Sequence, residues 1–160
     1  MRLKILIEEN TLEMHDDELF QFEAEGTTLP AAVAQGYVEH EGARIWYATF
    51  GAGQPVILLH GGLGHSGNWG HQVPALVDNG HRAIVIDDRR HSREMHDARP
   101  IAADYVASDV LAVMDALQLA QADLVGWSDG AVIALILARQ VPARVRSVPS
   151  AWLQHGSQRR

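Results

Sequence analysis

The residue with the clearest chemical potential is Ser128, at the centre of the segment Gly126–Gly130 with the pattern G-x-S-x-G. The apolar run Ala122–Val125 precedes this segment, and the apolar stretch Ala131–Gln140 follows it. That setting predicts a sharp turn between a strand and a helix, which projects the serine hydroxyl clear of a sheet as a nucleophile. Glycines at both ends avoid collisions with backbone, and the Asp129 amide at the helix start could stabilise an oxyanion. The alternative, a chance match in a glycine-rich chain, is disfavoured by the flanking strand and helix.

A second candidate site is the glycine loop His60–Gly64, which directly follows the apolar run Val56–Leu59. Residues 62–67 fit the dinucleotide fingerprint G-x-G-x-x-G. Asp87 and Asp88 lie about twenty residues further on, where a ribose-binding acid would end the next strand. The loop therefore has two competing functional interpretations.

The position of the next helix separates these two interpretations. A dinucleotide loop must run straight into its helix, so that the helix N-terminus meets the pyrophosphate. Here residues 68–72 intervene, and Pro74 marks the expected helix start. The spacing favours an oxyanion loop, in which a backbone amide near Gly62 faces the serine.

Strand-like and helix-like segments alternate around both sites. Strands are expected at Tyr37–His40, Arg44–Phe50, Val56–Leu59, Arg82–Asp87 and Ala122–Val125. Helices are expected at Pro74–Asn79, Ala102–Leu119 and Ala131–Gln140. The last three strands are continuous apolar runs, which is typical of parallel strands covered on both faces. This order predicts an α/β fold with a doubly wound, mostly parallel sheet.

Composition limits the kinds of site and partner. The chain has 160 residues, a net charge of −7 and no cysteine, which excludes disulfides, thiol catalysis and Cys-based zinc sites. No apolar run approaches the ~18 residues of a membrane helix, and the acidic balance argues against nucleic acid. The chain start is too short and too soon acidic for a signal peptide, so we expect a cytoplasmic protein without a membrane partner. His60, His65 and His71 lack helical pairing, and we expect neither a metal nor a cofactor.

Residues 1–35 differ from the rest of the chain. Residues 1–30 carry eight carboxylates against two basic side chains. Leu3–Ile7 predicts a strand, and Thr11–Phe20 predicts a short helix behind a threonine cap. Because no clear period runs through the segment, we interpret it as an acidic N-terminal extension of undefined order.

The landmarks of residues 36–148, taken in order, resemble those of the α/β-hydrolase family. They are the His60–Gly64 loop, Trp69, the Asp87–His91 segment and the Gly126–Gly130 elbow. In that family the triad runs in the order serine, acid, histidine. The resemblance implies a serine hydrolase of a small ester- or lactone-like substrate, with Ser128 as nucleophile. It also implies oxyanion-hole and supporting residues, which are Gly62, Leu63 and Asp129 for the hole and His60, Gly61, Gly126, Trp127 and Gly130 for support.

Two places depart from the family pattern. Arg90 and Ser92 stand where the family has glycines, and they would be strained if the loop needs positive φ. Asp87, Arg89 and His91 are expected to brace this loop and not to catalyse.

The second departure is the C-terminal part of the sequence. After Asp129 there is no Asp or Glu, and His155 is the one later histidine, so we expect the triad acid and histidine to be absent. Arg144–Val148 predicts a strand that Pro149 interrupts. Residues 149–160 do not resemble the family and are treated as a separate tail.

The sheet is therefore expected to be incomplete at its C-terminal side, with two consequences. Losing the base of a serine triad costs on the order of 10⁶ in kcat, so the chain is expected to be weak or inactive. The last helix is apolar nearly all round, which predicts self-association through an exposed apolar edge. A non-catalytic remnant or binding module and, less favoured, an NAD(P)-binding oxidoreductase stay open as alternatives.

Overall fold

The computed structural model describes residues 3–7, 10–14, 28–62, 64–87 and 103–149. The strands are β1 (Leu3–Ile7), β2 (Asn10–Met14), β3 (Ala34–His40), β4 (Ala43–Phe50), β5 (Gln54–Leu59), β6 (His81–Asp87), β7 (Ala122–Gly126) and β8 (Val145–Ser147). The helices are α2 (Gln72–Asp78), α3 (Ala103–Ala116) and α4 (Asp129–Gln140), with two 3-10 turns, η1 (Ser66–Trp69) and η2 (Pro142–Arg144). None of the described helices is long and apolar enough to cross a membrane.

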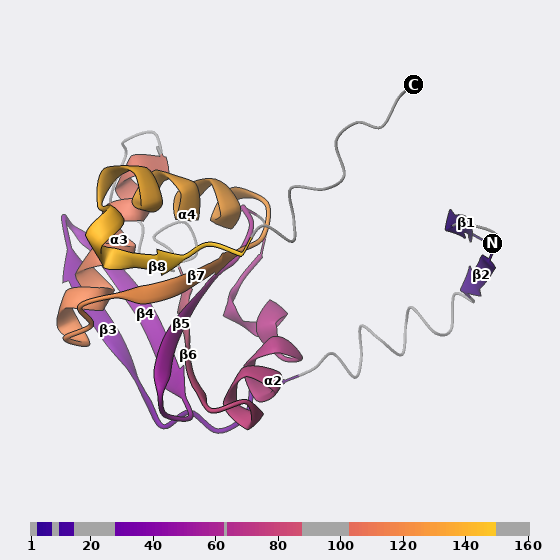
Figure 1. Ribbon diagram of the computed structural model, residues 1–160, viewed down its shortest axis with the longest axis horizontal. Coiled ribbons are helices and arrows are strands. Elements are labelled where there is room, and N and C mark those ends of the chain that lie inside the picture. The colour runs from indigo at the N-terminus through magenta and orange to yellow at the C-terminus, as the bar shows by residue number, and fades with distance from the viewer. Residues whose placement is uncertain (1–2, 8–9, 15–27, 63, 88–102, 150–160) are drawn as a thin grey trace.

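A six-stranded sheet in the order β3-β4-β6-β5-β7-β8 forms the centre of the molecule (Figure 1). The pairs β6–β5, β5–β7 and β7–β8 are parallel, whereas β3–β4 and β4–β6 are antiparallel. The antiparallel hairpin turns at Glu41 and Gly42, whose φ values of 46° and 77° suit a two-residue connection. This arrangement confirms the predicted mostly parallel sheet and places β5 in its middle.

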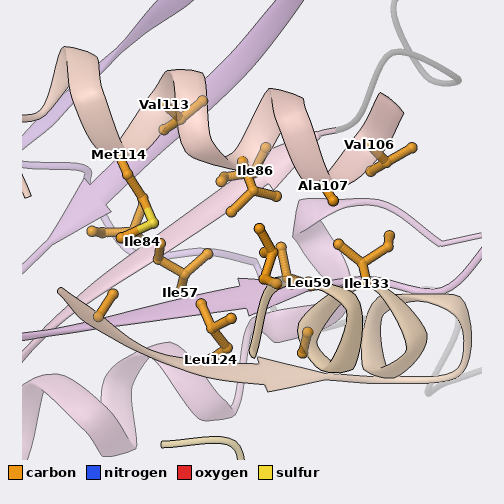
Figure 2. Packing of buried hydrophobic residues seen from close by; sticks show 14 of the residues in the cluster. Ile57, Leu59, Ile84, Ile86, Val106, Ala107, Val113, Met114, Leu124 and Ile133 are labelled. Carbon is orange, nitrogen blue, oxygen red and sulfur yellow. The ribbon is translucent and has the colours of Figure 1, made fainter. Parts of the chain in front are cut away.

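Helices cover both faces of this sheet, which explains the continuous apolar runs in its central strands. In β5, Ile57 and Leu59 belong to the core shared with α3 and α4 (Figure 2). Val56 and Leu58 alternate with them and belong to the opposite core, where Val73 of α2 is fully buried. Each such apolar side chain contributes about 1.5–3 kcal/mol on burial. The end of β5 is therefore held rigidly from both sides.

Two helices begin earlier than predicted, and each difference has a local reason. Helix α2 begins at Gln72, which leaves Pro74 within the first turn, where an N–H has no intrahelical acceptor. Helix α4 begins at Asp129 and not at Ala131, because the turn around Ser128 enters the helix without a spacer. This early start brings the first amides of α4 to the candidate nucleophile.

Helix α3 ends inside the predicted range Ala102–Leu119. Gln118 has a φ of 56°, and the Leu119 N–H donates to the carbonyl oxygen of Met114 at 2.8 Å. A left-handed residue with this bond stops a helix and starts the return toward the sheet. The chain then enters β7 at Ala122.

The first two strands form a separate antiparallel pair, with Leu3 opposite Met14 and Ile7 opposite Asn10. The strand predicted at Leu3–Ile7 is confirmed. The helix predicted at Thr11–Phe20 is wrong over Thr11–Met14, which lies in β2. Pairing with β1 satisfies the backbone there, and a helix this short is only marginal without tertiary support. Residues 15–20 lie outside the described part of the chain.

Packing of the main domain begins upstream of Gly36. Gly36 is the residue from which alternating strands and helices can be recognised in the sequence. Leu29 and Ala32 pack against the core on the α2 side of the sheet. The Val33 N–H donates to the carbonyl oxygen of Thr49 at 2.8 Å and so continues the pairing of β3 with β4. These residues lie in the stretch that the sequence assigned to the N-terminal extension.

The strand predicted at Arg144–Val148 is confirmed as β8, which is three residues long and forms one edge of the sheet. Arg144 holds it by donating to the carbonyl oxygens of Ala120 (3.1 Å) and Leu119 (3.0 Å) and to Asp115 (2.7 Å). Side-chain contacts thus support an edge whose backbone ladder is short.

Candidate active site

Ser128 occupies the turn that joins β7 to α4, as the sequence predicts. Its φ of 54° and ψ of −119° are unusual for a residue with a side chain. Such a conformation costs about 1–3 kcal/mol and persists only where the surroundings enforce it. Part of that enforcement is a hydrogen bond from the Trp127 N–H to the carbonyl oxygen of Leu59 at 3.0 Å. Ser128 itself is exposed, so its hydroxyl is open to solvent.

The glycines on either side of the serine are required by close backbone contacts. A Cβ placed on Gly130 would overlap the carbonyl oxygen of Leu59, and a Cβ on Gly126 would overlap the backbone of Gly130 and Ala131. The elbow therefore packs against the end of β5 at a distance that only glycine permits. This contact sets Ser128 beside the point where the glycine loop leaves the sheet.

The N-terminal end of α4 directly follows Ser128. The amides of Gly130 and Ala131 donate to the carbonyl oxygens of Trp127 (2.9 Å) and Ser128 (3.0 Å), which closes the elbow. Asp129 is the first residue of the helix and directly follows the serine. Its amide therefore lies at the positive end of the helix dipole, where negative charge on a substrate oxygen is stabilised.

The glycine loop lies against this elbow. A Cβ on Gly61 would come within 3.1 Å of Ser128 Cβ and 3.3 Å of Trp127 Cε3. The Gly64 N–H donates to the carbonyl oxygen of Gly61 at 2.9 Å and closes a tight turn. Gly62 lies in this turn and is half-buried, whereas Leu63 lies outside the described residues. The two motifs found in the sequence therefore meet at the carboxyl ends of β5 and β7.

A buried polar network holds the ends of the glycine loop. His60, only 3% exposed, places Nδ1 2.7 Å from the carbonyl oxygen of Gly61. Its Nε2 lies 4.0 Å from Oδ1 of Asp87, at the end of β6. The same carboxylate accepts from Ser66 N–H (2.6 Å) and Ser66 Oγ (3.1 Å). One carboxylate thus contacts both His60, the first residue of the glycine loop, and Ser66, two residues beyond its end. The bracing role expected for Asp87 concerned the segment that follows β6, and residues 88–92 of that segment lie outside the described part of the chain.

The dinucleotide interpretation of this loop does not fit the structure. Residues 62–67 lead into the 3-10 turn η1, and α2 begins only at Gln72, so the loop does not run directly into the N-terminus of an α-helix. Asp87, the expected ribose-binding acid, instead holds Ser66. Asp88, with Arg89, Arg90, His91 and Ser92 of the expected bracing loop, lies outside the described residues.

Two polar residues near the site were missed by the sequence reasoning. Ser66 is buried and caps Asp87, but nothing in its neighbourhood distinguishes it from an ordinary loop serine. Asp109 is fully buried in α3 and lines, with His60, a cavity of about 10 Å³, which is room for a single water molecule. The sequence could have indicated Asp109, because this carboxylate lies three residues after Val106 and interrupts the apolar face of an amphipathic helix.

The described part of the site lacks a cluster of metal ligands. Among the described residues, no three His, Asp or Glu side chains come close enough to hold an ion.

Comparison with known proteins identifies the family of this fold. The sequence profile of the α/β-hydrolase fold matches residues 54–150, which include both motifs and the central strands. The chain belongs to the α/β-hydrolase fold family. This hydrolase-fold chain is 31% identical over 126 residues to serine hydrolase BPHL of Mus musculus, covering 76% of the chain and 43% of the relative. It is also 31% identical over 126 residues to bifunctional epoxide hydrolase 2 of Sus scrofa, covering 76% of the chain and 22% of the relative.

Solved structures of α/β-hydrolases show the same arrangement. Est816, described as an N-acyl homoserine lactone degrading enzyme, is 35% identical with a TM-score of 0.66. The match covers 71% of this chain and 43% of that one. The chain therefore spans less than half the length of these hydrolase relatives.

Proposed function

We propose that this chain carries the nucleophile and oxyanion hole of a serine-dependent α/β-hydrolase. The observation that carries the proposal is the contact between the two motifs, with Gly61 packed against Ser128 at the head of α4. Ser128 is the proposed nucleophile, and the amides of Asp129 and of Gly62 or Leu63 are the proposed oxyanion donors.

The geometry supports acyl transfer in two steps. Ser128 Oγ attacks the carbonyl carbon of an ester, its proton passes to a base or to solvent, and the carbonyl oxygen becomes an oxyanion. Collapse then breaks the bond to the leaving alkoxide, which takes up a proton, and leaves an acyl-serine that water hydrolyses. Donors aimed at the oxyanion lower the barrier of both steps, and removal of one such donor costs on the order of 10²–10³ in kcat.

A small ester or lactone is the proposed substrate class. The Est816 structure, with its lactone-degrading description, is among the similar structures and supports this class. Other relatives are described as a serine hydrolase and an epoxide hydrolase, so the family alone does not select the substrate. The cavity beside His60, at about 10 Å³, has room for a water molecule but is too small for an acyl group.

Turnover by these 160 residues is expected to be low. The sequence after Asp129 contains no Asp or Glu, and His155 is the one later histidine. Without a triad base, oxyanion contacts alone retain on the order of 10³–10⁴ over the reaction in water. The alternative is a non-catalytic hydrolase-fold module, in which the elbow persists without reacting.

A fluorophosphonate probe with a fluorescent tag separates these two outcomes. The wild-type chain should be labelled slowly but measurably, Ser128→Ala should not be labelled, and Ser147→Ala should behave as wild type. Ser147 is a matched control because it is also exposed but lies on β8. Equal labelling of wild type and Ser128→Ala would reject Ser128 as the nucleophile, and a folded wild type without labelling would favour the non-catalytic module.

We further propose that the chain self-associates through the outer face of α4. Val132 and Leu135 are 51% and 48% exposed, and they lie three residues apart on the same side of the helix. The nearby strand β8 is an edge of the described sheet, and such an edge offers backbone groups for pairing with another chain. Leu135→Glu should shift sedimentation toward the monomer while Glu39→Gln, on the distant strand β3, leaves it unchanged. A wild-type monomer at high concentration would contradict the proposal.

Cytoplasmic location stays a prediction from the sequence.

A further inference from the structure

Two histidines of the described chain occupy N-cap positions, and their side chains behave differently there. His65 precedes the 3-10 turn η1, and its ring nitrogen Nδ1 accepts from the Gly67 N–H at 3.0 Å. His71 holds the same position at the start of α2, but its side chain makes no cap hydrogen bond. Both residues are exposed, so protons from solvent reach either ring. The two histidines therefore differ in contact and not in access.

The direction of the hydrogen bond at η1 fixes the protonation state of the His65 ring. A backbone N–H can only donate, so Nδ1 must present a lone pair to Gly67, and the proton of the neutral ring lies on Nε2. In the charged imidazolium both nitrogens carry hydrogens, and Nδ1 can no longer accept. The cap therefore forms with a neutral ring and is lost when the ring takes up a proton.

The capped turn is closed by a reciprocal pair of residues. The His65 N–H donates to Oδ1 of Asn68 at 2.8 Å, and the Asn68 N–H donates to the His65 carbonyl oxygen at 3.0 Å. A Cβ on Gly67 would come within 2.5 Å of the ring Cε1, so the glycine lets the ring lie directly against the backbone. Of the two side chains in this capping box, only the histidine can change its charge.

The turn η1 connects the glycine loop to the core on the α2 side of the sheet. A Cβ on Gly64, the last residue of the loop, would come within 2.7 Å of Asn68 Oδ1, so loop and turn are in contact. Ser66 anchors the turn to Asp87 of β6 through two hydrogen bonds. Trp69, the last residue of the turn, is 6% exposed and packs in that core. A change in the turn therefore reaches both the loop and the core.

We infer that His65 is a pH-sensitive cap, which closes η1 while its ring is neutral and releases the turn when the ring is protonated. Histidine changes charge between about pH 5 and 8, so the device responds near neutral pH. The titratable groups at this end of the neighbouring elements are Asp87 on β6, His60 directly after β5 and His71 at the start of α2. They act on the turn indirectly, because the Gly67 amide donates to His65. The inference concerns the fold and does not depend on the reactivity of Ser128.

The first test follows the Gly67 amide by nitrogen-15 NMR between about pH 8 and 5.5, where histidines change charge and ordinary carboxylates do not. In wild type, the neutral His65 ring should carry its proton on Nε2, and the Gly67 amide resonance should move with the titration of this ring. Its hydrogen-exchange protection, corrected for the intrinsic rate, should fall about fivefold, the loss expected for a cap of typical strength. A neutral ring protonated on Nδ1, or an amide that does not follow the ring, would overturn the inference without any variant.

The second test compares matched substitutions at the two N-cap histidines. His65→Asn supplies an amide oxygen that accepts at every pH, so the protection of the Gly67 amide should stay constant over the same range. His65→Ala should show low protection throughout. His71→Asn changes the histidine that makes no cap bond, so protection should fall as in wild type. A folded His65→Asn chain that loses protection as wild type does, or a His71→Asn chain that no longer loses it, would overturn the inference.

Discussion

Two turns at the same edge of the sheet carry the candidate chemistry, and they are held in different ways. The elbow between β7 and α4 is held by steric contact, because its glycines pack on Leu59 and on the first turn of α4. The loop between β5 and η1 is held by polar side chains, namely His60, Asp87 and Ser66. The comparison teaches that the elbow depends on the absence of side chains at two glycines, whereas the glycine loop depends on a carboxylate from another strand.

The largest expected effect comes from disturbing the close packing of the elbow on β5. Gly130→Ala should lower the free energy of unfolding by about 3 kcal/mol or more, because the new Cβ collides with the carbonyl oxygen of Leu59. Gly42→Ala is the matched control, since Gly42 has a positive φ but no atom within 4 Å of the added Cβ. Urea denaturation of both variants measures the difference. Equal losses would mean that close packing does not define the elbow.

A smaller effect on stability is expected from weakening the polar contacts that hold the glycine loop. Asp87→Asn should lower the free energy of unfolding by about 1.5–3 kcal/mol, the range for hydrogen bonds to a charged group. It removes the charge that faces His60 and weakens both bonds from Ser66. Asp78→Asn, on an exposed position at the end of α2, should change stability little. Thermal melts compare the two, and equal melting temperatures would show that the loop does not depend on Asp87.

Replacing Ser128, the proposed nucleophile, with glycine tests whether the backbone of the elbow is strained. Ser128→Gly should raise the free energy of unfolding by about 1 kcal/mol, because glycine adopts the φ of 54° without a steric penalty. Ser128→Ala keeps a Cβ and should show no such gain. Denaturation curves of the two variants distinguish strain from the loss of the hydroxyl, and a gain in both would contradict the strain account.

The smallest effect is expected at a strained residue outside the site. Gln118, with a φ of 56° at the end of α3, should tolerate glycine with a gain of about 0.5 kcal/mol. The probe reaction at Ser128 should be unaffected, because the Gln118 turn lies at the opposite end of β7 from the elbow. A change in labelling rate would mean that the two ends of β7 are coupled.

The sequence predicted most of the central fold and the elbow, for a physical reason. Close packing at the elbow requires glycine at 126 and 130, and two covered faces require the apolar runs of the central strands. These requirements appear in the residue types themselves. The helix predicted across Thr11–Met14 was wrong, because strand pairing with β1 depends on a partner that local propensity does not reveal.

The polar half of the site was less predictable. Ser66 meets Asp87 across 21 residues of sequence, and Asp109 reaches the cavity beside His60 only through the packing of α3. Such contacts depend on the strand order and on where each helix lies, which a single sequence specifies only indirectly. The glycine loop and the elbow lie side by side, as the sequence implied, but the polar contacts that hold the loop in place came from the structure.

Mass spectrometry of the chain after reaction with the fluorophosphonate tests the central claim most directly. The account predicts one adduct, with loss of fluoride, on the peptide that contains Ser128, and none in Ser128→Ala under the same conditions. An adduct spread over several serines, or located on a serine other than Ser128, would contradict it.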